Sequence, residues 1–279
     1  MKEHAENYLI TRDQLHVAKA RELLKNYKFE SIAKLKRFLG ITYLAGVNSS
    51  QKISKGAKLN YLTLVLYLSA SRNAGIDICK FATTGCRLAC LVGSGHALIE
   101  ERAGRKTIAV SRVIKTWLVM FRRDLANHLL QSEIDSAKRK AQRTGQGFAV
   151  RLNGTSDLDF GDIIKANPSV QFYDYTKDPT RPLWWPNYNV TFSYSSFLRM
   201  DHYRKALLMG ASLAIPTHEF EKCLSIPGTF SMDETDLRFL DRGKFGLLKA
   251  KRTSNLSGGI ENRFILSASE VKQLVRALS

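Results

Sequence analysis

The chain has 279 residues, a hydrophobic content of 44% and a formal net charge of +18. This length is enough to bury a substantial core in one large α/β domain or two smaller ones. No apolar run reaches the roughly 18 residues of a membrane span, and no charged-then-apolar leader follows Met1. A disulfide framework is not expected from four cysteines in a chain of this size. We therefore expect a cytoplasmic protein without a membrane partner.

The positive charge is concentrated in the first half of the chain. Residues 1–150 carry 26 basic and 11 acidic side chains, whereas residues 151–279 carry 17 and 14. A concentration of cationic side chains favours binding to polyanions, because neutralised phosphates release their condensed counterions. We therefore predict a nucleic-acid partner; the alternative is a generally basic, solvated surface.

The chain opens with a helical region. A capping-box pattern from Thr11 to Gln14 predicts a helix start, and a basic amphipathic stretch continues to about Leu39. We assign residues 1–47 to a basic helical N-terminal extension and residues 48–279 to an α/β core domain. A cationic loop at 48–56 leads into residues 59–68, whose β-branched and aromatic content predicts the first interior strand.

Three cysteines, Cys79, Cys86 and Cys90, follow this first strand within one segment. One loop could wrap all three sulfurs around a metal and leave a coordination position open, which predicts an iron–sulfur cluster or a zinc ion. Cys223, His96 and His218 are candidate fourth ligands. In the alternative interpretation the cysteines pack as small hydrophobic side chains.

The longest helical periodicity covers about residues 107–143, and strand patterns follow at 148–152, 170–176, 190–194, 211–215 and 245–248. A terminal helix is expected at 267–278. Strands that alternate with helices indicate an α/β protein with a mainly parallel sheet, open or closed into a partial or irregular TIM-like barrel.

Polar and acidic residues gather where two of these strands end, at the edge where ligands of α/β proteins bind. Carboxylates of this kind can hold Mg²⁺ or Mn²⁺, a tyrosine can act as a nucleophile or stack on a base, and a lysine can neutralise developing charge. In the alternative interpretation the aspartates only cap turns. The candidate catalytic residues are Asn153, Asp157, Asp174, Tyr175 and Lys177.

Nucleic-acid contacts are predicted from basic clusters and from an aromatic loop that could stack on unpaired bases. The aromatic loop could instead form a hydrophobic lid. The predicted contact residues are Lys52, Lys55, Lys58, Arg105, Lys106, Lys138, Arg139, Lys140, Arg143, Trp184 and Trp185.

Several of these motifs together resemble a family of poorly characterised proteins encoded by bacteriophages and other mobile elements. The resemblance spans roughly residues 48–250 and implies a cytoplasmic setting in a bacterial host. It rests on Lys55-Gly56, residues 61–63 and 66–68, the three cysteines, Arg-Leu-Asn-Gly-Thr-Ser-Asp at 151–157, and residues 172–177, 191–193 and 236–241.

A second resemblance is to radical S-adenosylmethionine enzymes, in which a three-cysteine loop follows the first strand of a partial barrel. The cysteines here are separated by six and three residues, whereas that family usually has three and two. Residues 153–157 would correspond to the segment that binds the cofactor amine. This resemblance implies a fold and does not by itself assign a function.

The leading hypothesis is a phage or mobile-element protein that binds nucleic acid and acts in replication or DNA processing, as a nuclease or strand transferase with metal-dependent phosphodiester chemistry. One alternative is an iron–sulfur radical enzyme that modifies a nucleic acid or nucleotide. Another is a noncatalytic nucleic-acid-binding module. We also predict that Asn153 and Asp157 lie at the same edge of the sheet as Cys79, Cys86 and Cys90.

Overall fold

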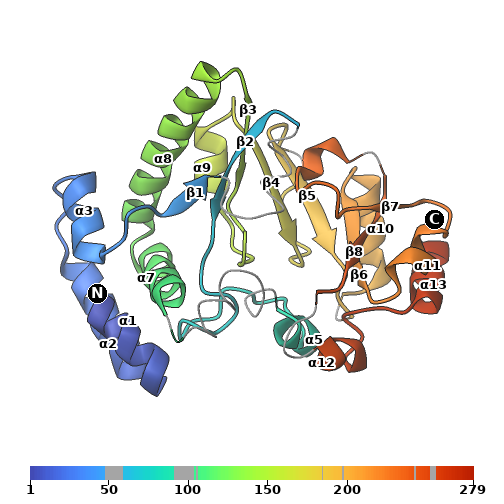
Figure 1. Ribbon diagram of the computed structural model, residues 1–279, viewed down its shortest axis with the longest axis horizontal. Coiled ribbons are helices and arrows are strands. Elements are labelled where there is room, and N and C mark those ends of the chain that lie inside the picture. The colour runs from blue at the N-terminus through green and yellow to red at the C-terminus, as the bar shows by residue number, and fades with distance from the viewer. Residues whose placement is uncertain are drawn as a thin grey trace.

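The computed structural model describes residues 1–47, 59–90, 104, 106–183, 185–196, 198–241, 243–251 and 256–279. Its centre is an open sheet with the strand order β1-β2-β3-β4-β5-β6-β8-β7 (Figure 1). The strands are β1 (Ala45–Val47), β2 (Tyr61–Leu66), β3 (Gly147–Arg151), β4 (Gln171–Thr176), β5 (Tyr188–Ser193), β6 (Ser212–Thr217), β7 (Thr229–Ser231) and β8 (Phe245–Lys249).

All strand pairs are parallel except β1 with β2, which is antiparallel. From β2 to β6 each strand lies beside the next one in the sequence, as in an opened barrel. The prediction of an α/β protein with a mainly parallel sheet is confirmed, and the predicted strands lie within about two residues of the observed ones.

The helices of the first half are α1 (Lys2–Thr11), α2 (Gln14–Asn26), α3 (Ile32–Leu39), α5 (Thr84–Leu88), α7 (Thr107–Phe121), α8 (Arg123–Arg143) and α9 (Gly161–Ala166). Those of the second half are α10 (Met200–Leu208), α11 (Phe220–Leu224), the short 3-10 helix η2 (Arg238–Leu240), α12 (Leu256–Glu261) and α13 (Ala268–Leu278). Within the part of the chain that the structure describes, no helix is long and apolar enough to cross a bilayer.

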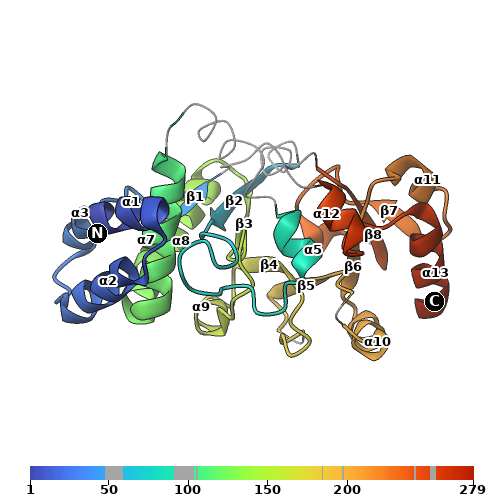
Figure 2. The same ribbon diagram turned by 90° about the horizontal axis from the view of Figure 1, so that it is seen from below.

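The two faces of the sheet differ because side chains alternate along each strand. One face, which we call the helix face, packs Leu64, Val150 and Phe172 into the main hydrophobic core together with α7 and α8. The other, which we call the η2 face, packs Ala149 and Tyr173 against Leu237 of the segment that contains η2. Figure 2 shows α9 and α10 on one side of the strands and α5 and α12 toward the other.

The N-terminal helices differ from the predicted start. Thr11 is the last residue of α1 and does not cap the next helix. Asp13 caps α2 instead, accepting a hydrogen bond from the Leu15 N–H at 2.8 Å, so the predicted capping box is wrong. Buried residues of α1 to α3 belong to the same core as the sheet, and β1 adds a strand to it. The assignment of 1–47 as a separate extension stays a prediction.

The predicted continuous helix at 107–143 is two helices. Arg122 separates α7 from α8 with φ −141° and ψ 69°, outside the helical region. Its guanidinium donates hydrogen bonds to the backbone oxygens of Leu24 at 2.8 Å and Tyr27 at 3.0 Å. These contacts tie the break to the end of α2, and no local sequence pattern could have specified them.

Candidate functional site at the carboxyl edge

The loop after β3 is fastened to the end of β2. The Gly154 N–H donates to the Leu66 oxygen at 3.1 Å, and the Thr155 hydroxyl donates to the Leu68 oxygen at 2.6 Å. A Cβ at Gly154 would lie 2.7 Å from the Leu66 oxygen, closer than any side chain can approach. The approach of these two segments therefore requires glycine at this position.

The same loop reaches the cysteine segment. The Asp157 N–H donates to the backbone oxygen of Ile78 at 3.0 Å, directly before Cys79. The structure therefore brings Asn153 and Asp157 to the same edge of the sheet as the cysteine loop. This is the convergence expected from their places after parallel strands.

Asn153 shapes the turn after β3 and is almost completely buried. Its side-chain oxygen accepts hydrogen bonds from the Ser156 hydroxyl at 2.8 Å and the Leu158 N–H at 2.9 Å, while its amide donates to the Leu158 oxygen at 2.9 Å. Both ends of the amide are thus used within the loop.

The Asp157 carboxylate joins the ends of β3 and β4. It accepts hydrogen bonds from the Thr176 hydroxyl at 2.7 Å, the Lys177 N–H at 2.8 Å and the Arg181 guanidinium at 2.8 Å. The Arg181 side chain is only 2% exposed and also donates to the Leu158 oxygen at 2.5 Å. No local sequence pattern identifies Arg181, because Asp157 and Leu158 lie more than 20 positions away in the chain.

The Asp174 carboxylate is buried on the helix face. It accepts a hydrogen bond from the Asn153 N–H at 2.7 Å and another from the Tyr188 hydroxyl at 3.3 Å. Burial raises the pKa of Asp174 to about 6, because the hydrogen bonds from Asn153 only partly offset the desolvation of the charge. Asp157 and Asp174 therefore already have protein partners for their carboxylates.

A second set of groups lies on the η2 face. The Arg151 guanidinium pairs with Asp236 at 2.7 Å, and the Tyr173 hydroxyl donates to the same carboxylate at 3.4 Å. The Arg151 guanidinium also lies 4.8 Å from the centre of the Tyr175 ring. Burial raises the pKa of Tyr175 above its usual range, so its hydroxyl stays protonated at neutral pH.

The cysteine loop is held by Arg87 of α5. Its guanidinium pairs with the Asp77 carboxylate at 2.9 Å, contacts the Ser71 hydroxyl, and donates to the backbone oxygens of Cys79 at 3.1 Å and Ala82 at 3.2 Å. One side chain thus connects the start, the middle and the helical end of the loop. No motif in the sequence marks this role, although Arg87 lies between two of the cysteines.

The Cys79 thiol interacts electrostatically with the thiols of Cys86 and Cys90. Burial, together with smaller contributions from the nearby Asp157, Cys86 and Cys90, raises the pKa of Cys79 to about 12. Cys223 is buried elsewhere, where its sulfur lies 3.3 Å from the Thr217 hydroxyl. Among the residues that the structure describes, no three Cys, His, Asp or Glu side chains are gathered closely enough to hold a metal ion. His96 lies outside those residues.

Three cations at this edge each lie over an aromatic ring. Arg112 of α7 lies 5.4 Å from the centre of the Tyr67 ring, Arg151 lies over Tyr175, and the Lys177 ammonium lies 5.2 Å from the centre of the Phe264 ring. All six side chains are partly exposed. Arg112 also interacts electrostatically with Cys90, so this cation–aromatic row begins beside the cysteine loop.

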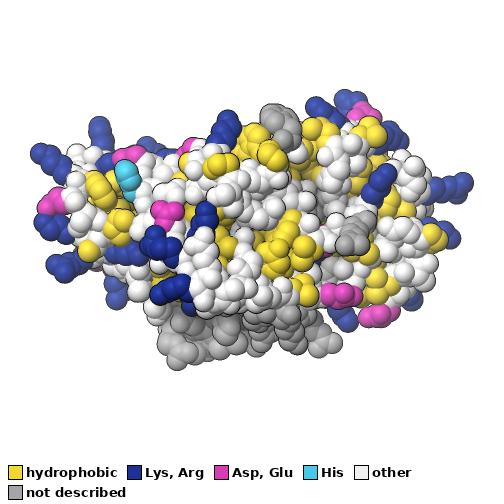
Figure 3. All heavy atoms as spheres, turned by 90° about the horizontal axis from the view of Figure 1, so that it is seen from above, with side chains coloured by type: hydrophobic (Ala, Val, Ile, Leu, Met, Phe, Trp, Pro, Cys, Tyr) yellow, Lys and Arg dark blue, Asp and Glu magenta, His cyan; other side chains and the backbone are white. Residues whose placement is uncertain are grey.

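Four of the predicted basic contacts lie elsewhere. Lys138, Arg139, Lys140 and Arg143 occupy the last turns of α8, which leads into the start of β3. The Lys138 ammonium donates to the Ser169 hydroxyl at 2.8 Å, just before β4 begins. The cluster therefore lies at the amino edge of the sheet, opposite the cysteine loop. Figure 3, seen from above, shows Lys and Arg side chains spread around the periphery.

The remaining predicted contact residues lie in different parts of the chain, some of them outside the described residues. Lys106 precedes the first turn of α7. Trp185 lines a pocket on the helix side of the carboxyl edge. Lys52, Lys55, Lys58, Arg105 and Trp184 lie outside the described residues.

A protein-family model described as "Gene product 88" matches residues 43–266. The match covers the sheet from β1 to β8, the cysteine loop and the loop after β3. Comparisons with curated proteins and with solved structures found no match.

Proposed function

The chain belongs to the Gene product 88 family of phage-type proteins, and we propose that it binds a nucleic-acid strand along the η2 side of the carboxyl edge, beside the cysteine loop. The observation that carries the proposal is the cation–aromatic row of Arg112 with Tyr67, Arg151 with Tyr175, and Lys177 with Phe264. Cations and aromatic rings in alternation suit a strand that offers phosphates and base faces in turn.

Two of the three cations in the row carry charge that no acidic side chain of the described residues neutralises. Arg112 and Lys177 each have an aromatic contact but form no ion pair with an acidic side chain among those found in the described residues. Lys138 and its cluster on α8 lie at the opposite edge, where the Lys138 ammonium donates to Ser169. A strand bound at the carboxyl edge would pass directly beside Cys90 and Cys79.

We propose that Cys79, Cys86 and Cys90 hold a zinc ion or an iron–sulfur cluster at this edge. A bound metal would stabilise thiolates, and such a cation is needed at Cys79 because burial raises the pKa of its thiol to about 12. Arg87 fixes the backbone of the loop, so binding would require mainly the thiol side chains to come closer together. A cluster would supply electron transfer, and a zinc ion would supply a structural or Lewis-acid centre.

The carboxylates support a different role from the one first expected. Mg²⁺ at Asp157 or Asp174 would have to replace hydrogen bonds from Thr176, Lys177, Arg181, Asn153 and Tyr188. We therefore propose that these two residues position the edge and that phosphodiester cleavage through them is the weaker candidate. Modification of a bound strand or nucleotide is favoured, because the cysteine loop follows the first parallel strand and contacts the loop after β3.

The binding test compares the two edges. Arg112→Ala and Lys177→Ala should each weaken binding of a single-stranded oligonucleotide and lower the slope of log K against log salt by about 0.7. The matched control is Lys140→Ala at the amino edge, which should leave both quantities unchanged. Loss of binding in the control but not in the two edge variants would refute this location.

The metal test is elemental and sulfide analysis of protein purified without oxygen. About one zinc, or iron with matching sulfide, should be present and should fall in Cys79→Ser, Cys86→Ser and Cys90→Ser. Cys223→Ser is the control, because this thiol is buried away from the cysteine loop, with its sulfur 3.3 Å from the Thr217 hydroxyl. Metal that is unaffected by the three loop variants would refute the assignment.

A further inference from the structure

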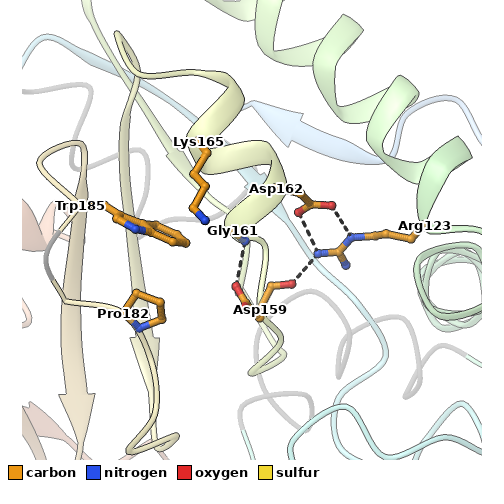
Figure 4. A pocket seen from close by; sticks show the side chains of 7 residues that line it. All are labelled: Arg123, Asp159, Gly161, Asp162, Lys165, Pro182 and Trp185. Atoms are coloured by element: carbon orange, nitrogen blue, oxygen red, sulfur yellow. Dashed lines mark hydrogen bonds and ion pairs between the residues drawn. The ribbon is translucent and has the colours of Figure 1, made fainter.

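A pocket of about 620 Å³ opens on the helix side of the carboxyl edge, away from the cation–aromatic row. Figure 4 shows the side chains that surround it. They come from the start of α8, the loop before α9, α9 itself and the loop between β4 and β5. The lining residues are Arg123, Asp159, Gly161, Asp162, Lys165, Pro182 and Trp185.

The Trp185 indole is held in a defined place. A Cβ at Gly161 would lie 2.5 Å from the indole ring, so the ring edge packs directly on the glycine backbone. The Lys165 ammonium lies 5.0 Å from the ring centre, and Tyr188 contacts the indole from within the sheet with its ring centre 5.9 Å away. In Figure 4, Lys165 and Pro182 lie on opposite sides of the indole. The pocket thus contains a fixed, partly exposed aromatic surface.

Two carboxylates, Asp162 and Asp159, line the polar side of the pocket, and Asp159 is the more exposed of the two. Asp162 pairs with Arg123 at 3.4 Å and accepts a hydrogen bond from the Asn127 amide at 2.5 Å. The Asp159 carboxylate accepts one hydrogen bond, from the Gly161 N–H at 2.8 Å, and the same oxygen lies 3.9 Å from the Arg181 guanidinium. The side chain is 67% exposed, so its other oxygen is open to a ligand.

We propose that this pocket binds a guanine base, stacked on Trp185 and hydrogen-bonded to Asp159. Guanine presents two adjacent N–H donors on its Watson–Crick edge, and these match the two oxygens of a carboxylate. Adenine and cytosine present an amino group beside an acceptor nitrogen, and uracil presents one N–H between two carbonyls, so each of these bases would place an acceptor against Asp159. The exposed Lys165 is placed to neutralise the phosphate of the same nucleotide.

The guanine could belong to a free nucleotide or to a strand. The second source rests on the proposed function, since a strand on the η2 side could turn around the edge and place one base in the pocket. The first source does not depend on that function. The two sources are separated by comparing guanosine monophosphate with short oligonucleotides that contain or lack guanine.

The experiment measures binding of the four nucleoside monophosphates by titration calorimetry. Guanosine monophosphate should bind at least about tenfold more tightly than the other three, because a well-aligned bidentate pair discriminates by about that factor or more. Trp185→Ala should abolish this binding, and Asp159→Asn should remove the preference while the indole still stacks. Asp201→Asn, an exposed carboxylate on α10, is the matched control and should behave as the wild type.

Circular dichroism of each variant shows whether a loss of binding reflects unfolding. Equal affinity for all four monophosphates and no preference among the oligonucleotides, or a guanine preference that survives Asp159→Asn, would overturn the proposal. Preference for guanine only in oligonucleotides supports the strand as the source. Arg112→Ala should leave guanosine monophosphate binding intact, so a failure of the cation–aromatic row and a failure of this pocket give different results.

Discussion

The pairing of Arg181 with Asp157 should contribute strongly to folding stability. The two side chains are 2% and 11% exposed, and the guanidinium also donates to the Leu158 oxygen. Replacing Arg181 by methionine keeps most of the apolar stem but leaves the Asp157 carboxylate buried without its counter-charge. Removing one partner of a buried pair costs about 3–5 kcal/mol, and we expect Arg181→Met to lower the free energy of unfolding by about 4 kcal/mol.

Urea unfolding followed by circular dichroism measures this loss. The double variant Asp157→Asn/Arg181→Met should recover at least about 1.5 kcal/mol relative to the sum of the single variants, because the two groups are in direct contact. Arg199→Met is the control: its pair with Asp201 is 79% and 64% exposed and should contribute less than about 0.5 kcal/mol. A cost below about 1 kcal/mol for Arg181→Met, or full stability of Asp157→Asn, would refute the structural role of the pair.

Three further predictions concern neighbouring groups. The folded-state pKa of Asp174, about 6, lies above its ordinary value of 3.8. The folded protein therefore binds the extra proton between these values, and the stability of the wild type relative to Asp174→Asn, measured by urea unfolding, should fall by about 2 kcal/mol as the pH rises from 4 to 6. A constant difference across that range would contradict the raised pKa. Cys79, with a pKa of about 12, should be alkylated by iodoacetamide at pH 8 about a thousandfold more slowly in the folded metal-free protein than in urea, as followed by peptide mass spectrometry; equal rates would show that the thiol is not buried. Gly154→Ala should lower the free energy of unfolding by about 2–3 kcal/mol, because its Cβ would meet the Leu66 oxygen at 2.7 Å. At Gly145 the φ is +64° and nothing lies within 4 Å of an added Cβ, so Gly145→Leu tests the backbone conformation and not a steric contact.

The positions of most strands could be read from the sequence because the information is local. Alternating or continuous apolar residues bounded by turn residues predicted β2, β3, β4, β5, β6 and β8 close to their observed bounds. Parallel order then placed Asn153, Asp157 and the cysteine loop at one edge, since the carboxyl ends of parallel strands share an edge. The roles of these residues as catalytic or metal-binding groups stay predictions.

The breaks and caps of the helices could not be predicted as well from the sequence. Asp13 caps α2 in place of Thr11, and α7 ends at Arg122, whose hydrogen bonds reach back to Leu24 and Tyr27. Across the break at Arg122 the periodicity of apolar residues continues, so the pattern alone could not show where α7 ends.

The sequence by itself determined most strands of the sheet, its mainly parallel character and the segment that carries the three thiols, because hydrophobic periodicity acts over a few residues. Tertiary structure alone decided which charges meet. It paired Asp157 with Arg181 and Arg151 with Asp236, and it placed Lys138 at the edge opposite the cysteines. Electrostatic and hydrogen-bond partners are chosen by distance in space, so the same residues that predict a metal site in sequence can be neutralised by a distant side chain once the chain folds.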